Sequence, residues 1–344
     1  PHCQTYTDNL HQTRPILVRD LSICGQGVFL KVPRRQFICP HCGKYPTEGL
    51  EGIDIRRNYT KRYEEHIYEK VKELTIEQVS KAEQLSHKQV KIFFLNKPHF
   101  KKIYWEMPEK ISMDEVSKEK GKRKFVTVIS DVDKSSLLEV VNSHKSNEII
   151  EELEKIPLEI RENVKEVSVD MWGGFPKVIQ AIFPNAQIVI DRFQVMKLVN
   201  KSLNKIRLLL GFKDLENRNI LLKNNADLIE EEMNKLQEIL RESPCLKIAY
   251  ELKEEFRDIY ETSTTVKMGK RKMEKWLTHA CLFFGKMSQT IKNHLTEICQ
   301  YFVNGTTSGV MEGINNKIKL ILRQSYGLKN FDLMREKLLA CLFK

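Results

Sequence analysis

The sequence predicts a multidomain α/β protein, with small N-terminal domains followed by a mixed sheet that an all-α segment interrupts. Four of the eight cysteines fall within the first 42 residues. Strand and helix patterns alternate from residue 111 onward, and residues 197–300 read almost entirely as amphipathic helix with few Gly or Pro. A chain of 344 residues is long enough for two or three domains and a substantial hydrophobic core.

The composition is that of a globular protein with an excess of positive charge. Hydrophobic residues make up 41% and charged residues 30%, which excludes a disordered chain. The net charge of +11 favours a polyanionic partner, most often nucleic acid, over an acidic small molecule. No apolar run approaches the roughly 18 residues of a membrane span, and the N-terminus lacks a signal-peptide pattern. We therefore expect a cytoplasmic protein without a membrane partner.

Residues 1–55 are predicted to form a zinc-ribbon-like domain. Segments 15–18, 27–32 and 35–38 read as short strands, and the motif Cys39-Pro40-His41-Cys42-Gly43 follows them. This spacing suits Zn²⁺, because the turn lets both thiolates face one tetrahedral ion.

A complete zinc site needs further ligands besides Cys39 and Cys42. Cys3 would complete a second Cys-x-x-Cys pair if the residue before Pro1 were Cys, so we expect the sequence to begin inside a zinc ribbon. The alternative fourth ligands are His2, His41 and Cys24. The other interpretation is a turn without metal.

Residues 56–110 are predicted to form a helical helix-turn-helix DNA-binding domain. One short helix begins near Leu74, and Ser86 is a suitable N-cap for a second helix that runs to Phe94. In this motif, polar residues at the start of the second helix enter the major groove. The DNA-binding candidates are therefore Ser86, His87, Lys88 and Gln89, with Arg56, Arg57, Lys61 and Arg62 for phosphates. A helix pair of any α-rich domain, with a solvated basic face, is the alternative.

Residues 111–200 are predicted to form the first part of an RNase H-like core. Three hairpin-connected strands are expected at 111–116, 125–130 and 136–141. Helix, strand, helix, strand and helix follow at 146–155, 166–170, 174–182, 187–190 and from 193. This order is the RNase H-like topology, a mixed sheet flanked by helices. An all-α insertion at 201–300 interrupts the core, and 301–344 complete it.

Three carboxylates are candidates for a catalytic metal site. Phosphodiester cleavage on such a sheet uses two metal ions, and Mg²⁺ prefers carboxylate oxygens. The expected positions are the first strand, the end of the fourth strand and a late helix, which hold Asp114, Asp170 and Glu312. Asp131 and Asp133 are alternatives to Asp114, although Asp is also favoured in hairpin turns.

Other side chains near these carboxylates have open roles. Asp191 is either an accessory metal neighbour or the N-cap of the following helix. Trp172 either stacks on a DNA base or packs beneath the sheet, whereas Trp105 and Trp276 are expected in the core.

The later cysteines are expected to be buried thiols: Cys245, Cys281, Cys299 and Cys341.

The predicted helix that carries Glu312 is basic. Positions 312, 315 and 319 share one helical face, which would position a DNA phosphate beside the metals. Its DNA-binding candidates are Asn315, Lys317, Lys319 and Arg323. A solvated basic face is the alternative interpretation.

At this point the sequence resembles the ISL-three family of bacterial insertion-sequence transposases. The resemblance covers the whole chain, and its specific motifs are Asp170-Met171-Trp172, Phe183-Pro184-Asn185-Ala186, Ile190-Asp191-Arg192-Phe193, Thr307-Ser308-Gly309-Val310-Met311-Glu312-Gly313-Ile314-Asn315-Asn316-Lys317-Ile318-Lys319 and Tyr326-Gly327-Leu328-Lys329-Asn330-Phe331. The family commonly has His where Gln194 stands here, and its first Cys pair is incomplete in this sequence.

The resemblance implies a DDE triad of Asp114, Asp170 and Glu312 with Mg²⁺ or Mn²⁺, and Zn²⁺ in the N-terminal domain. It implies a DNA transposase of a bacterial insertion sequence, nucleoid-associated in the cytoplasm. Such an enzyme binds double-stranded DNA, both terminal inverted repeats and target DNA, as an expected homodimer, and performs metal-dependent cleavage and strand transfer. The alternatives are a catalytically silent DNA-binding protein or repressor, and a structure-specific nuclease without strand transfer.

Overall fold

The computed structural model describes residues 3–54, 57–96, 105–117, 125–171, 174–306, 309–326 and 328–343. The chain divides into two compact units. Unit 1 holds residues 1–102 and 319–341, and unit 2 holds 103–318 and 342–344. Residues 319–341 thus group with the N-terminal residues, whereas the sequence prediction keeps 301–344 together. The domain bounds drawn from the sequence stay a prediction.

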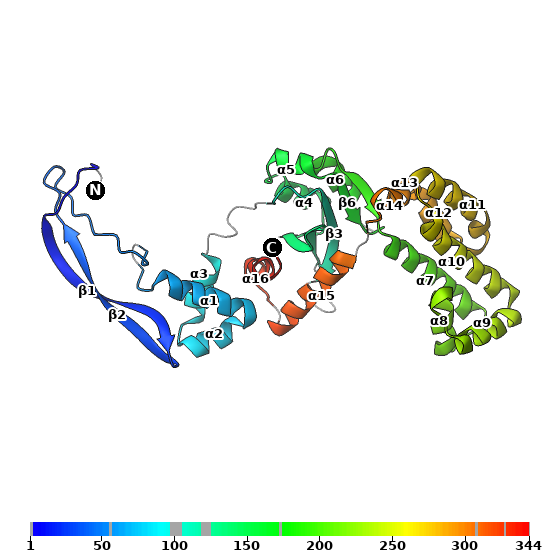
Figure 1. The fold of residues 1–344 in the computed structure, drawn as a ribbon, viewed down its shortest axis with the longest axis horizontal. Helices are drawn as coiled ribbons and strands as arrows, with labels where there is room; N and C mark the ends of the chain where they lie inside the picture. Colours follow the sequence, from blue (N-terminus) through cyan, green and yellow to red (C-terminus); the bar gives the residue numbers. More distant parts are fainter. Residues whose placement is uncertain are drawn as a thin grey trace. The chain divides into compact units, whose positions relative to one another are not determined.

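Unit 1 begins with a long two-stranded hairpin (Figure 1). Strand β1 covers Leu10–Ile23 and β2 covers Gln26–Phe37, paired antiparallel. The expectation of three short strands was wrong, because Pro33 lies opposite Pro15 within one continuous ladder. Proline lacks an N–H donor but is tolerated where a strand has a free edge, as both strands of a hairpin do.

Three helices follow in unit 1: α1 at Lys61–Glu73, α2 at Ile76–Glu83 and α3 at His87–Leu95. Both α2 and α3 begin with a capping box, in which the N-cap hydroxyl and the side chain of the third helical residue satisfy each other's backbone N–H. Gln84 adopts a left-handed φ of 53°, which makes the turn between them tight. The result is a helix-turn-helix arrangement.

The last helix, α16 at Phe331–Leu342, packs on these helices. Leu333 joins the core that Ile67 and Phe93 form within unit 1. Lys337, which is 4% exposed, donates from Nζ to the carbonyl oxygen of Leu74 at 2.8 Å. The C-terminal segment therefore supports the helix-turn-helix motif.

Unit 2 contains a five-stranded sheet in the order β5-β4-β3-β6-β7. Its strands are β3 Lys110–Ser117, β4 Phe125–Asp131, β5 Ser136–Val141, β6 Glu166–Val169 and β7 Gln187–Ile190. The first three are antiparallel, and β6 and β7 continue parallel to β3. This order confirms the RNase H-like mixed sheet that the sequence predicts.

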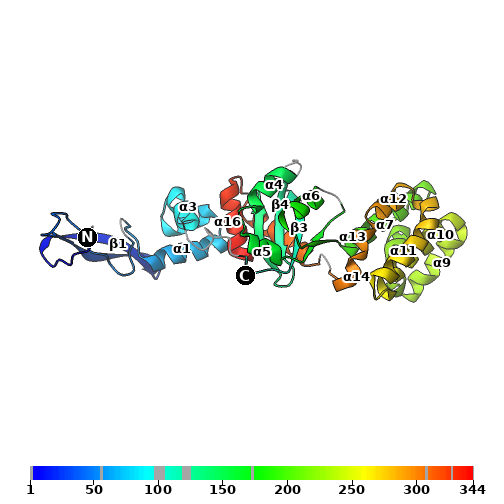
Figure 2. The ribbon, with the colours of Figure 1, turned by 90° about the horizontal axis from the view of Figure 1, so that it is seen from above.

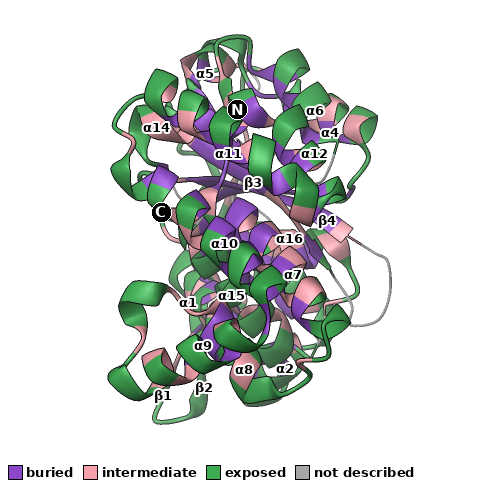
Figure 3. Ribbon diagram, turned by 90° about the vertical axis from the view of Figure 1, so that its right-hand side faces the viewer, coloured by how far each residue is buried: buried purple, intermediate pink, exposed green. Residues whose placement is uncertain are grey.

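One face of the sheet is covered by α4 (Ser146–Leu153), α5 (Leu158–Asn163) and α6 (Phe175–Ile182), as Figures 1 and 2 show. Helix α5 was not expected from the sequence. Ile111 and Met113 of β3 point into this layer, and the central strand β3 is coloured as buried or intermediate over most of its length (Figure 3). Trp105 also belongs to this core, as expected.

The helical insertion has its own core around Phe256 and Trp276. Its elements are α7 Arg192–Leu209, α8 Leu215–Leu222, a 3₁₀ turn Asn225–Asp227, α9 Glu230–Glu242, α10 Pro244–Thr262, α11 Val266–Phe284, α12 Lys286–Asn293, α13 Leu295–Cys299 and α14 Tyr301–Asn304. Cys299 is buried, but Cys245 and Cys281 are exposed, so the core expectation was wrong for these two. Across the described parts of the chain, no helix combines the length and the apolar character needed to cross a membrane.

Candidate active site and zinc site

Asp114 lies within β3, and Asp170 directly follows β6, the neighbouring parallel strand. The β3–β6 register pairs Ser112 with Ser168, and both aspartates come two residues later. Side chains two residues apart lie on the same face of a strand, so Asp114 belongs to the face of β3 that carries Ser112. Asp114 and Asp170 both act electrostatically on Glu115, so the two carboxylates lie near one another. Both aspartates are half-buried. The fold therefore brings these two predicted metal ligands to one place on the sheet.

Helix α15 (Gly309–Gln324) supplies the third carboxylate and contacts this face. Asn315 Nδ2 donates to Asp114 Oδ2 at 2.6 Å, and the Met311 sulfur lies 3.9 Å from Ser130 Oγ on β4. In Figure 1 the helix, drawn in orange, lies beside β3. Glu312 precedes Asn315 by three residues, one helical turn, and its side chain is exposed.

Further ionisable groups surround the two aspartates. Burial raises the pKa of Glu115 above its ordinary value; His144 opposes this rise, whereas Asp170 and Asp114 add to it. Glu115 therefore lies within electrostatic range of both. A concentration of negative charge of this kind is suited to divalent cations.

The donor set of Asp114, Asp170 and Glu312 fits a hard cation such as Mg²⁺, which prefers carboxylate oxygens. These three carboxylates are not all within 4.8 Å of one another in the described structure. Two-metal sites hold their ions about 3.5–4 Å apart, so ligands of different ions need not touch one another. The fit of this site to Mg²⁺ therefore rests on the chemistry of its carboxylate donors.

The alternative acidic residues have structural contacts. Asp131 is buried at the end of β4, and its Oδ1 accepts from the Lys134 backbone N–H at 2.9 Å, as expected in a turn. Asp133 is exposed in the same turn. Asp191 caps α7 by accepting from the Gln194 backbone N–H at 3.2 Å, which favours the cap interpretation. Trp172 lies outside the described residues.

The remaining candidates on α15 differ in exposure. Asn315 is 8% exposed and directs its amide to Asp114 rather than to solvent. Lys317 and Lys319 are exposed, and Arg323 Nε donates to the carbonyl oxygen of Lys319 at 3.2 Å. DNA binding by these four residues stays a prediction.

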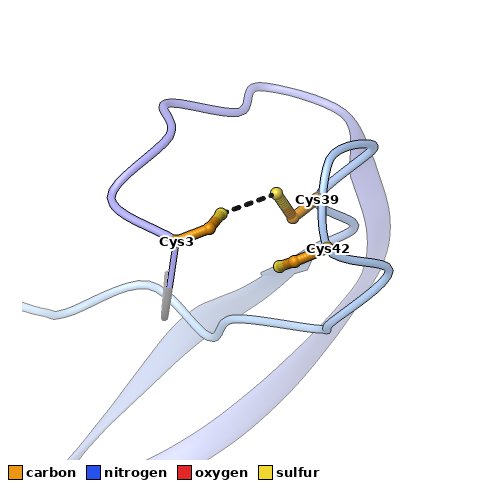
Figure 4. Close-up of side chains that lie close together, drawn as sticks. All are labelled: Cys3, Cys39 and Cys42. Atoms are coloured by element: carbon orange, nitrogen blue, oxygen red, sulfur yellow. Dashed lines mark hydrogen bonds between the residues drawn. The ribbon is translucent and has the colours of Figure 1, made fainter.

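Three cysteine sulfurs gather at one end of the hairpin (Figure 4). The ligand atoms of Cys3, Cys39 and Cys42 lie within 4.8 Å of one another, with 3.5 Å between the sulfurs of Cys3 and Cys39. Hydrogen bonds from Thr5 and from Cys39 lower the pKa of Cys3 to about 6, which favours the thiolate that Zn²⁺ binds. This arrangement supports the predicted zinc site.

A fourth ligand is not assigned among the described residues. Cys24 lies in the turn between β1 and β2, and neither it nor His41 belongs to the cluster of three. His2 lies outside the described residues.

Of the four side chains of the helix-turn-helix motif that are predicted to bind DNA, two are exposed and two form hydrogen bonds within the protein. His87 and Lys88 are exposed at the start of α3. Ser86 and Gln89 form the capping box, and Gln89 Nε2 also donates to the Tyr59 hydroxyl at 2.8 Å. Cap formation therefore occupies two of the four side chains predicted to reach DNA bases.

The basic candidates before and within α1 have acidic neighbours. Lys61 Nζ lies 3.2 Å from Asp54, and Arg57 Nε lies 4.0 Å from Glu64. Arg62 forms a two-pronged ion pair with Asp20 of β1, with Nε donating at 2.7 Å. Arg56 lies outside the described residues. These contacts leave DNA binding by the group a prediction.

Two buried acids of unit 1 were missed by the sequence analysis. Asp20 and Glu83 are each 3% exposed. Glu83 accepts a hydrogen bond from the Tyr63 hydroxyl at 3.1 Å and forms an ion pair with Lys70. Asp20, on β1 of the hairpin, forms an ion pair with Arg62 of α1. The burial of Glu83 could have been predicted from its position in the sequence, because Glu83 follows the buried Val79 by four residues and so lies on the apolar face of α2.

Comparisons with known proteins agree with this architecture. A family model described as "Transposase" (DDE_Tnp_ISL3) matches residues 111–338, and one described as the zinc-finger of transposase IS204/IS1001/IS1096/IS1165 matches residues 1–42. The transposase for insertion sequence element IS1001 of Bordetella parapertussis is 25% identical over 348 aligned positions, covering 95% of this chain and 84% of the relative.

A second relative covers a shorter segment. The transposase for insertion sequence element IS1557 of Mycobacterium tuberculosis (strain CDC 1551 / Oshkosh) is 32% identical over 117 residues, which is 33% of this chain and 26% of the relative. The matched family models together span the zinc-ribbon end, the sheet and α15. The chain therefore belongs to the ISL3 family of DDE transposases.

Proposed function

We propose that this transposase binds the terminal inverted repeats of its insertion sequence and cuts and joins DNA at a divalent-metal site. Asp114, Asp170 and Glu312 would hold the metal. The observation that carries the proposal is that Asp114 on β3 and Asp170, directly after the adjacent parallel strand β6, each follow the paired Ser112 and Ser168 by two residues. Helix α15 is hydrogen-bonded to Asp114 through Asn315.

The chain's own residues bind and orient the reactants in this mechanism. Bound Mg²⁺ or Mn²⁺ would supply charge stabilisation for the attacking and leaving oxygens. Asn315 holds the direction of the Asp114 carboxylate, and the exposed Glu312 would be the third carboxylate to hold the metal. Lys317, exposed on α15, is suited to an adjacent DNA phosphate.

The proposed chemistry consists of two displacements at phosphorus. In the first, a water oxygen bonds to phosphorus at the element end, the P–O3′ bond breaks, and the 3′ oxygen leaves as a hydroxyl. In the second, this 3′-hydroxyl bonds to a target phosphorus, a target P–O3′ bond breaks, and the proton passes to the departing 3′ oxygen. No covalent enzyme intermediate is needed, and transposition joins two ends, so we expect a homodimer in the DNA complex.

The test is cleavage of duplex DNA that carries the parent element's own ends, with Mg²⁺ or Mn²⁺. We expect wild-type protein to cut at the ends and to form joined products, and Asp170→Asn to lose at least about a thousandfold in rate. Asp133→Asn is the matched control, because it makes the same change in an exposed turn of the same sheet.

Two outcomes would contradict the proposal. Specific binding to the ends without cutting, under both metals, would favour the DNA-binding or repressor alternative. Loss of DNA cleavage in Asp133→Asn but not in Asp114→Asn would indicate that the first metal ligand is Asp133, in the turn between β4 and β5.

A further inference from the structure

One face of the β1–β2 hairpin carries four long polar side chains that face one another across the strands. The register pairs Gln12 with Gln36 and Arg14 with Arg34. Residues 12 and 14 lie on the same face of β1, so the two pairs are adjacent. We call Gln12, Arg14, Arg34 and Gln36 the cross-strand quartet.

The quartet is internally connected but its charge is uncompensated. Gln12 Nε2 donates to Gln36 Oε1, and Arg14 Nε donates to Gln12 Oε1 at 3.1 Å. Within the described residues, neither Arg14 nor Arg34 has a carboxylate partner, and Arg34 Nε is shielded from solvent without a hydrogen bond. Like charges directly opposite each other destabilise a strand pair, so two such arginines are costly to the hairpin alone.

The other arginines of the hairpin behave differently. Arg19 pairs with Glu83, and Arg35 lies 3.0 Å from Glu48. Arg19 and Arg35 thus have acidic partners from outside the hairpin, whereas Arg14 and Arg34 have none among the described residues. This contrast indicates an external anionic ligand.

The hairpin edges disfavour a protein partner that adds a strand. The β2 edge is already occupied at Gln36, which pairs with Thr47. Pro15 and Pro33 lie opposite each other and remove an N–H donor from each strand. A ligand would therefore contact the side chains on the face rather than the backbone at the edge.

We propose that the cross-strand quartet binds the phosphate backbone of duplex DNA. This deepens the proposed function and rests on it. Arginine forks match phosphate oxygens, and glutamine amides add neutral donors. A two-stranded ribbon is narrow enough for the major groove, and 14 residues of β1 extend about 45 Å at about 3.3 Å per residue. The hairpin thus extends DNA contacts beyond the helix-turn-helix motif.

The test compares DNA affinity at several salt concentrations for the full chain and for the double variant Arg14→Gln, Arg34→Gln. Loss of two phosphate contacts should reduce the slope of log affinity against log salt by about 2, and weaken binding about tenfold or more at the same salt. Phosphate contacts carry no sequence information, so end DNA and unrelated duplex should lose affinity equally.

Two further variants keep the result interpretable. Lys31→Gln with Arg35→Gln removes the same charge from the opposite face of the hairpin, and should change the slope far less. Arg14→Lys with Arg34→Lys keeps the charge and should restore the wild-type slope. Zinc content and melting temperature verify that each variant remains folded.

The proposal is overturned if wild-type protein binds end DNA and the double glutamine variant, folded and zinc-loaded, binds with the same affinity and slope; the proposed function would then still stand. It is also overturned if that variant changes oligomeric state instead, since the quartet would then contact protein. A wild-type chain that binds no DNA would overturn both proposals.

Discussion

Asn315 and Asp114 are joined by a hydrogen bond from Nδ2 to Oδ2 at 2.6 Å, between α15 and the central strand β3. The other carboxylate oxygen, Oδ1, accepts from the Glu115 backbone N–H at 2.7 Å. Both oxygens of Asp114 are therefore held in direction before any metal binds. DNA contact by Asn315 stays a prediction, and from this geometry we propose that Asn315 is also a positioning residue for the proposed metal ligand Asp114.

We expect Asn315→Ala to weaken metal dependence rather than DNA binding. Removing a side chain that orients a metal ligand typically costs about 10–100-fold in metal affinity or activity. The Mg²⁺ concentration that gives half-maximal cleavage should therefore rise, while affinity for end DNA stays close to that of wild type. Both quantities are measured on the same DNA substrate.

Asn316→Ala is the control for this experiment, because Asn316 is the exposed neighbour on the same helix. It should leave the Mg²⁺ titration unchanged. If Asn315→Ala lowers DNA affinity and leaves the Mg²⁺ titration unaltered, Asn315 contacts DNA as the sequence suggested.

We expect the three gathered cysteines to bind zinc. Cys39→Ser removes a buried cysteine of the cluster and should abolish stoichiometric zinc, measured by elemental analysis of purified protein. Cys24→Ser changes an exposed thiol outside the cluster and should retain it. Equal zinc loss in both variants would instead indicate that Cys24 is the fourth ligand. Full retention of zinc in Cys39→Ser would contradict the predicted zinc site.

The sheet was predictable because its signals are local. Apolar strands such as 136–141 are bounded by turn residues, and the order of strands and helices limits the possible topologies. The same local signals located Asp170 at the end of β6. Pro33 misled the strand prediction, since proline ends most central strands but is tolerated at a hairpin edge.

Other features depend on tertiary contacts that periodicity does not encode. Helical spacing placed Asn315 on the face of Glu312 without identifying Asp114 as its partner. Lys253 is fully buried, and its Nζ donates to the carbonyl oxygens of Leu221 and Lys223 near the end of α8. A lysine in an amphipathic helix normally predicts an exposed position, so this contact requires the packed structure.

We expect the Asp20–Arg62 pair to make the stability of unit 1 depend on pH. Hydrogen bonds from Arg62 hold the pKa of Asp20 well below its ordinary value of about 3.9. A lowered pKa in the folded state stabilises the fold above the ordinary pKa, and this contribution is lost as pH falls below about 4. Asp20→Asn should therefore lower the urea midpoint most at neutral pH.

The measurement is urea unfolding of wild type and Asp20→Asn at several values between pH 7 and pH 3, with Asp8→Asn as an exposed control. The gap between wild type and Asp20→Asn should narrow as pH falls below about 4. A gap that stays constant over this range would show that the variant acts through packing and not through the charge of Asp20.

We expect Gly269→Ala to destabilise the helical insertion. A Cβ at Gly269 would lie 2.1 Å from the Phe302 ring, which packs against α11 in the insertion core. Phe302 must then shift, and overpacking of this kind costs about 1–3 kcal/mol. Gly313→Ala on α15 is the matched control, since a Cβ there meets nothing within 4 Å and a helical alanine is favoured by up to about 1 kcal/mol. The melting temperature should thus fall for Gly269→Ala and rise for Gly313→Ala. Equal shifts in the two variants would mean that the Phe302 ring moves aside without a cost in stability.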